Sequence, residues 1–294
     1  MIVTDDFKND KILDLAITSQ TDGAVSIALE IGDDSFRSDT SLYVRSYPTC
    51  IVVVDLDADN RLDLIITISH ANTVSVLLGN GTSDFKETDQ YTTGELLAFL
   101  AYAGLNSDGK KGIAVANQKG NGNSTLRDEF SIALDAQPVS FITTDSNNDN
   151  KADLLFVNQK NNSLSIYAGY GNGTSYKWTM FTASRSVTAV MAGDFEKDGR
   201  IDLTITSNGR NVLSVMFRDD NEAFFVQLNR TVGRYPSAIT AVDLDKDVKL
   251  DLVVINRSDN TMSVLMNYGG RNFFNQTKHS TGIILSAITV WLSE

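Results

Sequence analysis

The chain has 294 residues, 42% of them hydrophobic, and a formal net charge of -12. This length and apolar content predict a packed core, in one large repeat domain or two ordinary domains. The acidic balance argues against a nucleic-acid-binding protein, because phosphates attract a basic face. No apolar run approaches the roughly 20 residues of a membrane-spanning helix, so no transmembrane segment is expected in this chain.

The beginning of the sequence and its cysteine content add two expectations. Met1-Ile-Val-Thr-Asp-Asp has neither a basic nor an apolar leader region, so no secretory signal is predicted in this chain. A single cysteine, Cys50, excludes an intramolecular disulfide, and its apolar neighbours predict a buried side chain. Another stabilising element is therefore expected, and a bound metal ion is the first candidate.

A nine-residue acidic loop recurs along the chain and is the strongest pattern in the sequence. Its copies are separated by 49, 49, 41, 49 and 49 residues, and a serine 20 residues after each intact start lies between two apolar residues, as in a β-strand. The loops begin at Asp6, Asp55, Gly104, Asp145, Asp194 and Asp243. The corresponding repeats are approximately 1–49, 50–98, 99–139, 140–188, 189–237 and 238–286.

Five of these loops carry oxygen-bearing side chains at alternate positions. Carboxylates at positions 1, 3, 5 and 9 repel one another unless a cation lies between them, and Ca²⁺ prefers such ligands together with a backbone carbonyl, here that of position 7. The predicted metal ligands are Asp6, Asp10 and Asp14; Asp55, Asp57, Asp59, Arg61 and Asp63; Asp145, Asn147, Asp149, Lys151 and Asp153; Asp194, Glu196, Asp198, Arg200 and Asp202; and Asp243, Asp245, Asp247, Lys249 and Asp251. Up to five calcium ions are expected.

The loops differ in ways that bear on this expectation. Lys8 occupies position 3 of the first loop, and an ammonium cannot ligate a cation, so this loop is expected to be the weakest of the five sites. The third loop has Gly104 and Gly112 at positions 1 and 9, which leaves Asn106 and Asp108 as its side-chain ligands and predicts no tightly held ion. Val248 at position 6, where the fourth intact loop has glycine, predicts a strained or differently turned loop.

About half of the 37 acidic residues lie in the five loops. Five calcium ions would bring the net charge to about -2, so the acidity is explained mainly by metal-site chemistry. An acidic face for a basic partner is the alternative.

Each repeat is expected to form four short strands, as its last full copy illustrates. The predicted strands are 238–242, 252–255 and 262–266, with a fourth beginning near Phe273 and Phe274. Prolines 48, 138 and 236 each precede a loop by seven residues, where a connection enters a strand. Four strands per unit of 40–50 residues are typical of a propeller blade, whereas a linear array would leave edges exposed. The predicted fold class is an all-β propeller of four-stranded blades.

The C-terminal segment 284–292 repeats the pattern of a first strand. We expect one propeller domain over residues 1–294, with six blades and this segment as the closing strand. An incomplete seven-bladed propeller is the alternative.

The loops, the apolar strands that follow them and the Gly-Asn-Gly-Thr turns at 79–82 and 171–174 resemble FG-GAP repeats, also called VCBS repeats. This resemblance implies a propeller like that of integrin α subunits, with Ca²⁺ in the loops between the first two strands of a blade and an extracellular or cell-surface location. An EF-hand does not fit, because position 12 of a loop that begins at Asp55 is Ile66, where an EF-hand needs a bidentate glutamate.

No catalytic constellation is evident, and His70 and His279 are expected in loops or on the surface, so an enzyme is not predicted. The leading hypothesis is a non-catalytic, calcium-binding extracellular propeller that serves protein interaction or cell adhesion, and a monomer is expected. The alternative is a lectin-like propeller, or an accessory module of a carbohydrate-active enzyme. Sugar stacking would use Tyr167, Tyr170, Tyr176 or Trp178. The ligand, whether protein or glycan, is not identified.

Glycosylation is expected among the sequons at Asn80, Asn123, Asn161, Asn172, Asn229, Asn256 and Asn275.

Overall fold

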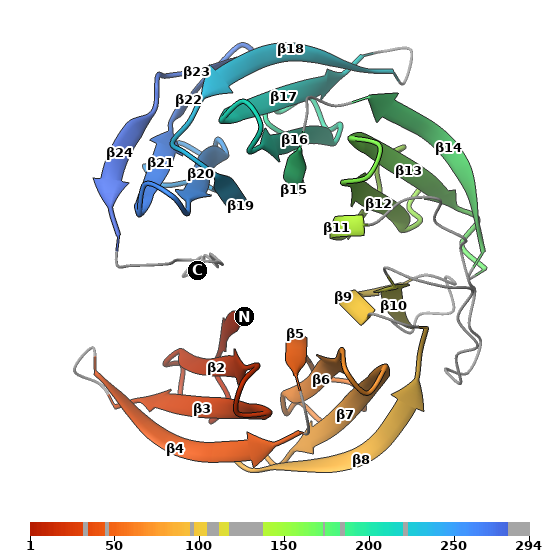
Figure 1. Cartoon of the computed structure of the whole chain (residues 1–294), viewed down its shortest axis with the longest axis vertical. Helices are drawn as coiled ribbons and strands as arrows, with labels where there is room; N and C mark the ends of the chain where they lie inside the picture. The colour runs from red at the N-terminus through yellow and green to blue at the C-terminus, as the bar shows by residue number, and fades with distance from the viewer. Residues whose placement is uncertain are drawn as a thin grey trace. The chain divides into compact units, whose positions relative to one another are not determined.

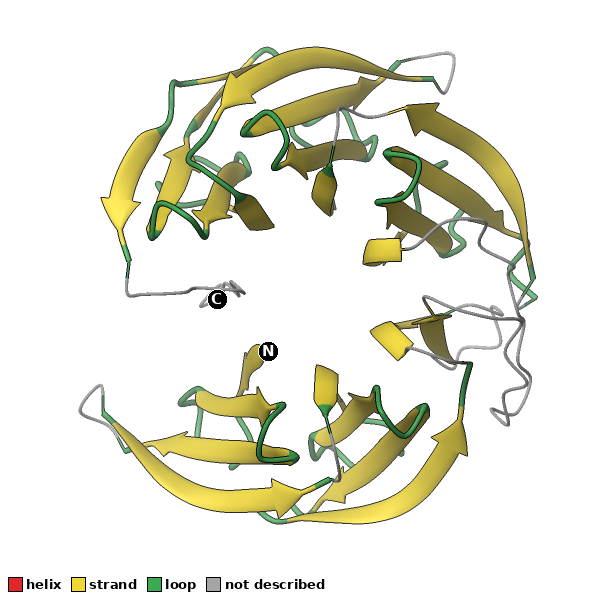
Figure 2. Ribbon diagram, in the orientation of Figure 1, coloured by secondary structure: helices red, strands yellow, loops and turns green. Residues whose placement is uncertain are grey.

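The computed structural model describes residues 1–31, 35–44, 47–94, 97–104, 112–117, 138–172, 174–182, 186–219 and 223–281 (Figures 1 and 2). These ranges contain β-strands and turns, and none of their segments is a helix long and apolar enough to cross a membrane. The chain divides into two compact units, one with residues 1–102 and 111–135 and the other with residues 103–110 and 136–294. The predicted strand 284–292 lies outside the described residues.

The first unit contains two four-stranded antiparallel sheets, each a meander in chain order. One sheet comprises β1 (Ile2–Asp5), β2 (Asp14–Ser19), β3 (Ala24–Glu30) and β4 (Phe36–Tyr43). The next comprises β5 (Pro48–Val54), β6 (Asp63–Ile68), β7 (Thr73–Gly79) and β8 (Phe85–Thr92). The third repeat contributes a two-stranded sheet of β9 (Leu97–Ala103) and β10 (Gly112–Asn117).

The second unit contains three further four-stranded sheets. They comprise β11 (Pro138–Thr144), β12 (Asp153–Asn158), β13 (Ser163–Gly169) and β14 (Ser175–Thr182); β15 (Val187–Gly193), β16 (Asp202–Ser207), β17 (Val212–Arg218) and β18 (Phe224–Thr231); and β19 (Pro236–Val242), β20 (Asp251–Asn256), β21 (Thr261–Leu265) and β24 (Thr277–Ser280). A short hairpin, β22 (Asn267–Gly269) with β23 (Asn272–Phe273), interrupts the last sheet. Within this unit β15 contacts both β11 and β19, so the first strands of successive blades are neighbours.

The all-β fold with four-stranded propeller blades is confirmed, but the expected number of six blades is not. The described residues form five such blades, because the third repeat shows only β9 and β10 as strands. This repeat is the one shortened by eight residues, and residues 105–111 and 118–137 fall outside the described part.

Burial explains why successive sheets stack. The second strands β6, β16 and β20 are buried along their whole length, so both of their faces are covered. The core clusters draw residues from two adjacent blades. One cluster joins Ile27 with Ile66, and another joins Ile166 with Ile205. A single blade cannot bury both faces of its sheet, so neighbouring blades stabilise one another.

The prolines lie where the sequence predicts. Pro48, Pro138 and Pro236 are the first residues of β5, β11 and β19, and a register shift follows each of them. Proline at the start of a strand avoids the loss of a ladder donor in its interior.

The outer ladder of the last blade is divided into two parts. A fourth strand was expected to begin near Phe273 and Phe274, and Phe273 of β23 pairs with Asn267 of β22, while β24 pairs with β21. Between these parts the amide of Phe274 donates to the carbonyl of Met266 at 2.8 Å. The side chain of Asn267 also donates to the carbonyls of Phe195 at 2.7 Å and Leu250 at 3.2 Å.

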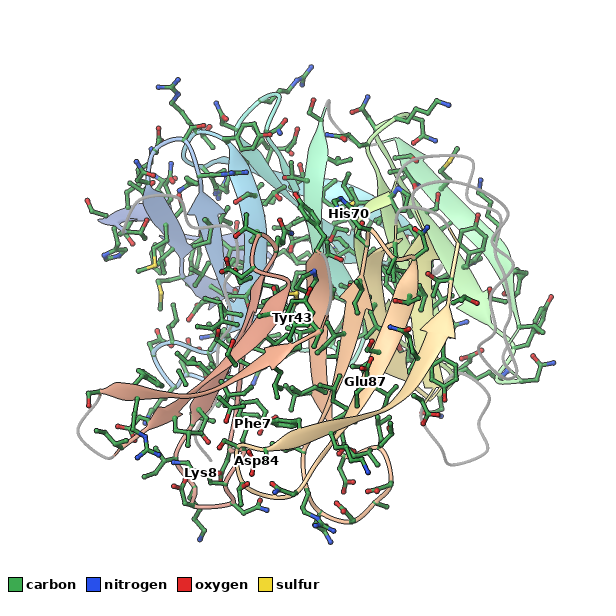
Figure 3. The ribbon with its side chains drawn as sticks, turned by 60° about the horizontal axis from the view of Figure 1, so that its bottom comes forward. Phe7, Lys8, Tyr43, His70, Asp84 and Glu87 are labelled. Atoms are coloured by element: carbon green, nitrogen blue, oxygen red, sulfur yellow. The ribbon has the colours of Figure 1, made fainter. Side chains whose placement is uncertain are left out.

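In each four-stranded meander the loop between the first two strands and the turn before the outer strand lie at the same end of the blade. In the first unit Figure 3 shows Lys8 and Asp84 at this end and His70 at the other. The acidic loops and the Gly-Asn turns therefore share one face of a blade.

Candidate metal-binding loops

All five acidic loops have the same backbone conformation, and each is named here by its first residue. Positions 4 and 6 have positive φ in every loop, with values of 57–81°. Position 6 was expected to need a residue that tolerates a positive φ, and Val248 has a φ of 70° there. Position 4 was not anticipated, because Ala58, Lys197 and Lys246 occupy it in three of the loops and carry no signal for a left-handed residue.

The first carboxylate of each loop organises this backbone. In the Asp55 loop its two oxygens accept hydrogen bonds from the backbone amides of Asp59 at 3.1 Å and Asn60 at 2.9 Å. The same pair of bonds occurs in the loops that begin at Asp6, Asp145, Asp194 and Asp243. Local side-chain acceptors of this kind hold a tight turn that the backbone alone would not favour.

The carboxylate at position 5 accepts from the amide of position 7 and also pairs with a basic side chain. Arg61 lies 2.6 Å from Asp59, and Lys151 lies 3.5 Å from Asp149. Arg200 pairs with Asp198 and Lys249 with Asp247 in the same way. The residues whose carbonyls were predicted as ligands thus direct their cationic side chains to the neighbouring acid.

The carboxylate at position 9 is buried and ties the loop to the end of the third strand. Asp63 accepts from the amide of Leu56 at 2.8 Å and from that of Gly79 at 2.9 Å. Equivalent pairs of bonds are made by Asp14, Asp153, Asp202 and Asp251. All five of these residues are at most 1% exposed. Each therefore links three segments of one blade.

Burial raises the pKa of these position-9 carboxyl groups above the usual range. Desolvation is the main cause of the raised pKa at Asp14, Asp63, Asp153 and Asp251. It raises the pKa of Asp202 to about 7, to which the nearby charges of Glu196 and Asp198 also contribute. Hydrogen bonds from backbone amides oppose this effect without cancelling it. A cation beside these groups would favour their ionised form.

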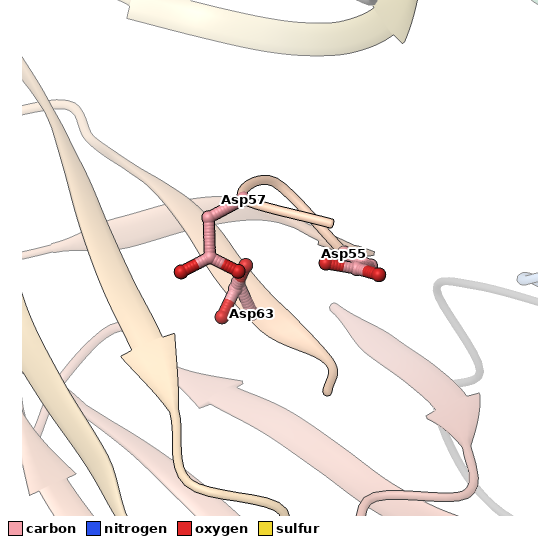
Figure 4. A group of neighbouring side chains, drawn as sticks. All are labelled: Asp55, Asp57 and Asp63. Atoms are coloured by element: carbon pink, nitrogen blue, oxygen red, sulfur yellow. The ribbon is translucent and has the colours of Figure 1, made fainter. Parts of the chain in front are cut away.

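The loops differ in the residue at position 3 and in the contacts that it makes. The carboxylate oxygens of Asp55, Asp57 and Asp63 approach within 4.8 Å of one another, as do those of Asp243, Asp245 and Asp247. Figure 4 shows Asp57 and Asp63 with their carboxylates adjacent and Asp55 beside them. Two oxygens that are each about 2.4 Å from one calcium ion are at most about 4.8 Å apart. These two acidic clusters can therefore hold a metal ion, and their hard oxygen donors fit calcium.

The other three loops place a different group at position 3. In the Asp145 loop Asn147 accepts from the amide of Asp149 at 3.0 Å through its side-chain oxygen. In the Asp194 loop Glu196 forms a bidentate ion pair with Arg271, one bond of which is 2.7 Å long. In the Asp6 loop Lys8 extends its ammonium group toward Asp10 and Asp14. Three of the predicted carboxylate ligands are thus gathered in each of two loops, whereas the residue at position 3 makes other contacts in the remaining three.

Contacts from adjacent blades hold the loops of the second unit, and sequence reasoning missed them. Arg218 donates to the carbonyl of Asn147 and to the side chain of Asn148, both at 3.1 Å. Asn148 in turn donates to the carbonyl of Gly199 at 2.7 Å. Arg218 and Asn267 both lie 24 residues after a loop start, and that shared register is the signal from which they could have been found.

Aromatic residues at position 2 form a second inter-blade contact. Phe7 packs edge-to-face against Phe85 with ring centroids 5.7 Å apart, and Phe195 packs likewise against Phe273 at 6.0 Å. Both pairs are separated by 78 residues in sequence, so the same contact recurs in the two units. The aromatic residue after each Gly-Asn turn thus belongs to the core in these blades.

The predicted sugar-stacking residues divide into partly buried and exposed groups. Trp178 packs on the core cluster with Phe224, with ring centroids 6.2 Å apart, and Tyr167 packs edge-to-face on Phe156 at 5.8 Å. Tyr170 and Tyr176 instead form an exposed pair with centroids 5.0 Å apart. Tyr268 and Phe274 form an equivalent exposed pair at 4.5 Å, 98 residues further on.

Both histidines are exposed, as expected. His70 stacks on Tyr47 with ring centroids 4.2 Å apart. His279 lies on the outer strand β24 rather than in a loop, and its Nε2 is 3.4 Å from the hydroxyl of Thr277.

The third repeat is described only in part. Gly104 follows β9, and Gly112 begins β10. Asn106 and Asp108, the two side chains that remained as ligands, lie outside the described residues.

Comparison with known proteins agrees with the repeat pattern. The family model described as FG-GAP-like repeat matches residues 6–66 and 145–205, and each match spans two consecutive acidic loops. A search of curated protein sequences found no match.

Solved structures share the fold at low sequence identity. The crystal structure of BBS1N in complex with ARL6DN, soaked with lead, aligns with a TM-score of 0.67 and 9% identity over 97% of this chain and 83% of that chain. The crystal structure of a protein from Lactobacillus plantarum aligns with a TM-score of 0.67 and 12% identity over 92% of this chain and 82% of that chain. These similarities concern the fold alone. The matched family model shows that the chain contains FG-GAP-like repeats at residues 6–66 and 145–205, and these residues lie in four-stranded propeller blades.

Proposed function

We propose that the chain is a non-catalytic, calcium-stabilised β-propeller that serves as an extracellular scaffold for protein interaction or adhesion. The observation that carries this proposal is the gathering of three carboxylates within 4.8 Å in the Asp55 and Asp243 loops. Like charges at this separation repel strongly unless a cation neutralises them. Calcium suits the site because every donor is an oxygen.

The ligands proposed for the Asp55 loop are Asp55, Asp57, Asp59, Asp63 and the carbonyl of Arg61. The Asp145, Asp194 and Asp243 loops would use the equivalent positions, with Asn147 and Glu196 at position 3. Glu196 would have to leave Arg271 to ligate an ion, so this loop is expected to bind calcium more weakly than the two gathered clusters. The bound ion would fix a loop whose position-9 carboxylate already joins three segments of the blade.

Removal of calcium tests this proposal directly. An ion held at a concentration one hundred times its Kd stabilises the folded state by about 2.7 kcal/mol per site. For a chain of this size, each kcal/mol corresponds to about 2–4 °C in Tm. We expect exhaustive chelation to lower the Tm by several degrees and re-addition of calcium to restore it.

Matched variants make this test specific to the loops. Asp57→Asn and Asp245→Asn should each reduce the calcium-dependent part of the Tm, whereas Asp84→Asn, an exposed acid outside the loops, should leave it unchanged. A Tm that does not respond to chelation would contradict calcium binding.

The extracellular location is proposed from the family resemblance and the sequons. Asn80 and Asn172 lie in exposed turns, whereas Asn256 is fully buried and donates to Thr261 and Ser263. On expression through a secretory pathway, we expect glycans at the turn sites and none at Asn256. Mass spectrometry of glycopeptides would measure this, and a chain with every turn sequon unmodified would count against a secreted form.

A lectin-like propeller, or an accessory module of a carbohydrate-active enzyme, is the second candidate. The exposed pairs Tyr170–Tyr176 and Tyr268–Phe274 favour it, because paired aromatic rings offer flat faces for sugar stacking. Saturable binding on a glycan array that is lost in Tyr176→Ala and retained in Tyr43→Ala, another exposed tyrosine, would support this candidate. No binding to any glycan would leave the protein-interaction scaffold as the better account.

We also propose that the six repeats belong to one monomeric propeller domain. Four of the five intervals between loop starts are 49 residues long, and this regular spacing supports equivalent blades. An experimental structure together with a mass measurement in solution would test both the blade number and the oligomeric state.

A further inference from the structure

The first acidic loop has the backbone of a metal loop but not its donor set. Asp6 accepts from the amides of Asp10 at 3.0 Å and Lys11 at 2.6 Å, as in the other loops. Asn9 and Lys11 have the same positive φ as their counterparts elsewhere. The difference is confined to position 3, where Lys8 replaces an acid or an amide.

The ammonium group of Lys8 lies inside this loop. Its Nζ is 2.8 Å from Asp10 Oδ2 and 3.3 Å from Asp14 Oδ1, and it donates to the carbonyl of Glu30 at 3.0 Å. These three oxygens come from position 5, position 9 and the end of β3. A calcium ion would draw on the first two of these groups.

The basic residue of the first loop lies at position 3 instead of position 7. In the other four loops the acid at position 5 pairs with Arg or Lys at position 7. Position 7 of the first loop is Ile12, and Asp10 pairs with Lys8 instead. The Lys8 ammonium therefore contacts the buried acid at position 9 as well as the acid at position 5.

Lys8 also compensates the buried acid. Asp14 is fully buried, and its other contacts are the amides of Phe7 and Glu30. A lysine ammonium is charged across the physiological range, and here three oxygen atoms surround it. A calcium ion in the same loop would be repelled by this charge at close range.

We propose that the Lys8 ammonium takes the place of the metal ion in the first loop, so that this loop holds β1, β2 and β3 together without calcium. The proposal rests on the proposed calcium binding only for the contrast with the other loops. It reduces the expected number of ions by one and makes one corner of the first unit insensitive to chelation.

Exchange of the position-3 residues tests the proposal in both directions. Lys8→Asp should add one calcium ion per chain, measured by isothermal titration or native mass spectrometry, and Asp57→Lys should remove one. Lys8→Met should leave the calcium stoichiometry unchanged. An unchanged stoichiometry in Lys8→Asp, or one fewer ion in Lys8→Met, would overturn the proposal.

Hydrogen exchange gives a readout that does not depend on calcium binding elsewhere. With a chelator present, the amides of Asp10 and Lys11 should exchange at least roughly tenfold faster in Lys8→Met than in the wild type, as expected on loss of hydrogen bonds to a charged group. In the wild type these amides should be indifferent to calcium, whereas those of Asp59 and Asn60 should exchange faster on chelation. Calcium-dependent protection of Asp10 and Lys11 in the wild type would refute the role of Lys8. If only the amides of Asp59 and Asn60 exchanged at a rate independent of calcium, the result would count against calcium binding in that loop and not against the role of Lys8.

Discussion

Arg271 forms a bidentate ion pair with Glu196 from the neighbouring blade of the second unit. Its guanidinium carbon also lies 5.4 Å from the ring centroid of Phe217 and 5.6 Å from that of Phe225. The pair raises the pKa of Arg271 and occupies both oxygens of a residue predicted to ligate a metal. This contact shows that an acid in the repeat register can serve blade-to-blade packing instead.

Removal of this contact should destabilise the second unit. We expect Arg271→Ala to lower the free energy of unfolding by about 1–2 kcal/mol, because a partly buried bidentate pair and two cation–π contacts are lost. Urea unfolding would measure it, and a double-mutant cycle with Glu196→Gln should give a coupling of about 1 kcal/mol. Arg234→Ala provides the control, since Arg234 is 77% exposed and 3.9 Å from Asp259, and it should cost under about 0.5 kcal/mol. Equal losses in Arg271→Ala and Arg234→Ala would contradict this account.

The buried acid at position 9 should matter more for stability than the exposed acid at position 5. Asp153 accepts from the amides of Ser146 and Gly169 and from the Ser146 hydroxyl, all within 2.5–2.9 Å. Asp153→Ala leaves these buried donors unpaired, so we expect a loss of about 2–4 kcal/mol in the presence of chelator. Asp149→Ala, in the same loop, should cost about 1 kcal/mol. Denaturant unfolding of both variants would measure the difference, and similar losses would show that burial at position 9 is not decisive.

Backbone strain at position 6 predicts a stabilising substitution. Val248 has φ 70° and its side chain is largely exposed, so it gains little from packing in return for this conformation. Replacement by glycine, which adopts positive φ freely, should raise stability by about 1 kcal/mol. Gly199 occupies the same position with φ 81° and open space where a Cβ would lie. Gly199→Val should therefore lower stability by a similar amount for the same reason. A stability change of the same sign in both variants would be inconsistent with strain.

The raised pKa of Asp202 predicts a pH dependence in metal-free protein. The carboxyl has a pKa of about 7 in the folded state and 3.8 ordinarily, so the folded chain retains a proton that the unfolded chain has lost. Folded protein then binds more protons than unfolded protein, and stability falls as pH rises from about 4 to about 7. The slope from one such group is at most about 1.4 kcal/mol per pH unit.

Unfolding in chelator across this pH range would measure the effect as the difference between wild type and Asp202→Asn. Asp84→Asn, which removes an exposed acid, should follow the wild type. An identical pH profile for wild type and Asp202→Asn would contradict the shift. Added calcium should reverse the trend, because the ion binds the ionised carboxylate.

Much of the fold could be predicted because its information is local. Alternation of apolar and polar residues and the 49-residue repeat indicated the strands, and Pro48, Pro138 and Pro236 begin strands as expected. The division of the last blade's outer strand between β23 and β24 was not predicted.

The sequence by itself determined the four-stranded blades, the acidic loops and the donor type at each loop position. Only the tertiary structure decided which loops gather their acids. Asp57 and Asp245 lie beside their partners, whereas Glu196 is held by Arg271 and the third position of the first loop carries an ammonium that points inward. The physical reason is that a carboxylate is neutralised by the nearest positive charge, and that charge comes from a side chain whose position depends on how the strands and neighbouring blades pack.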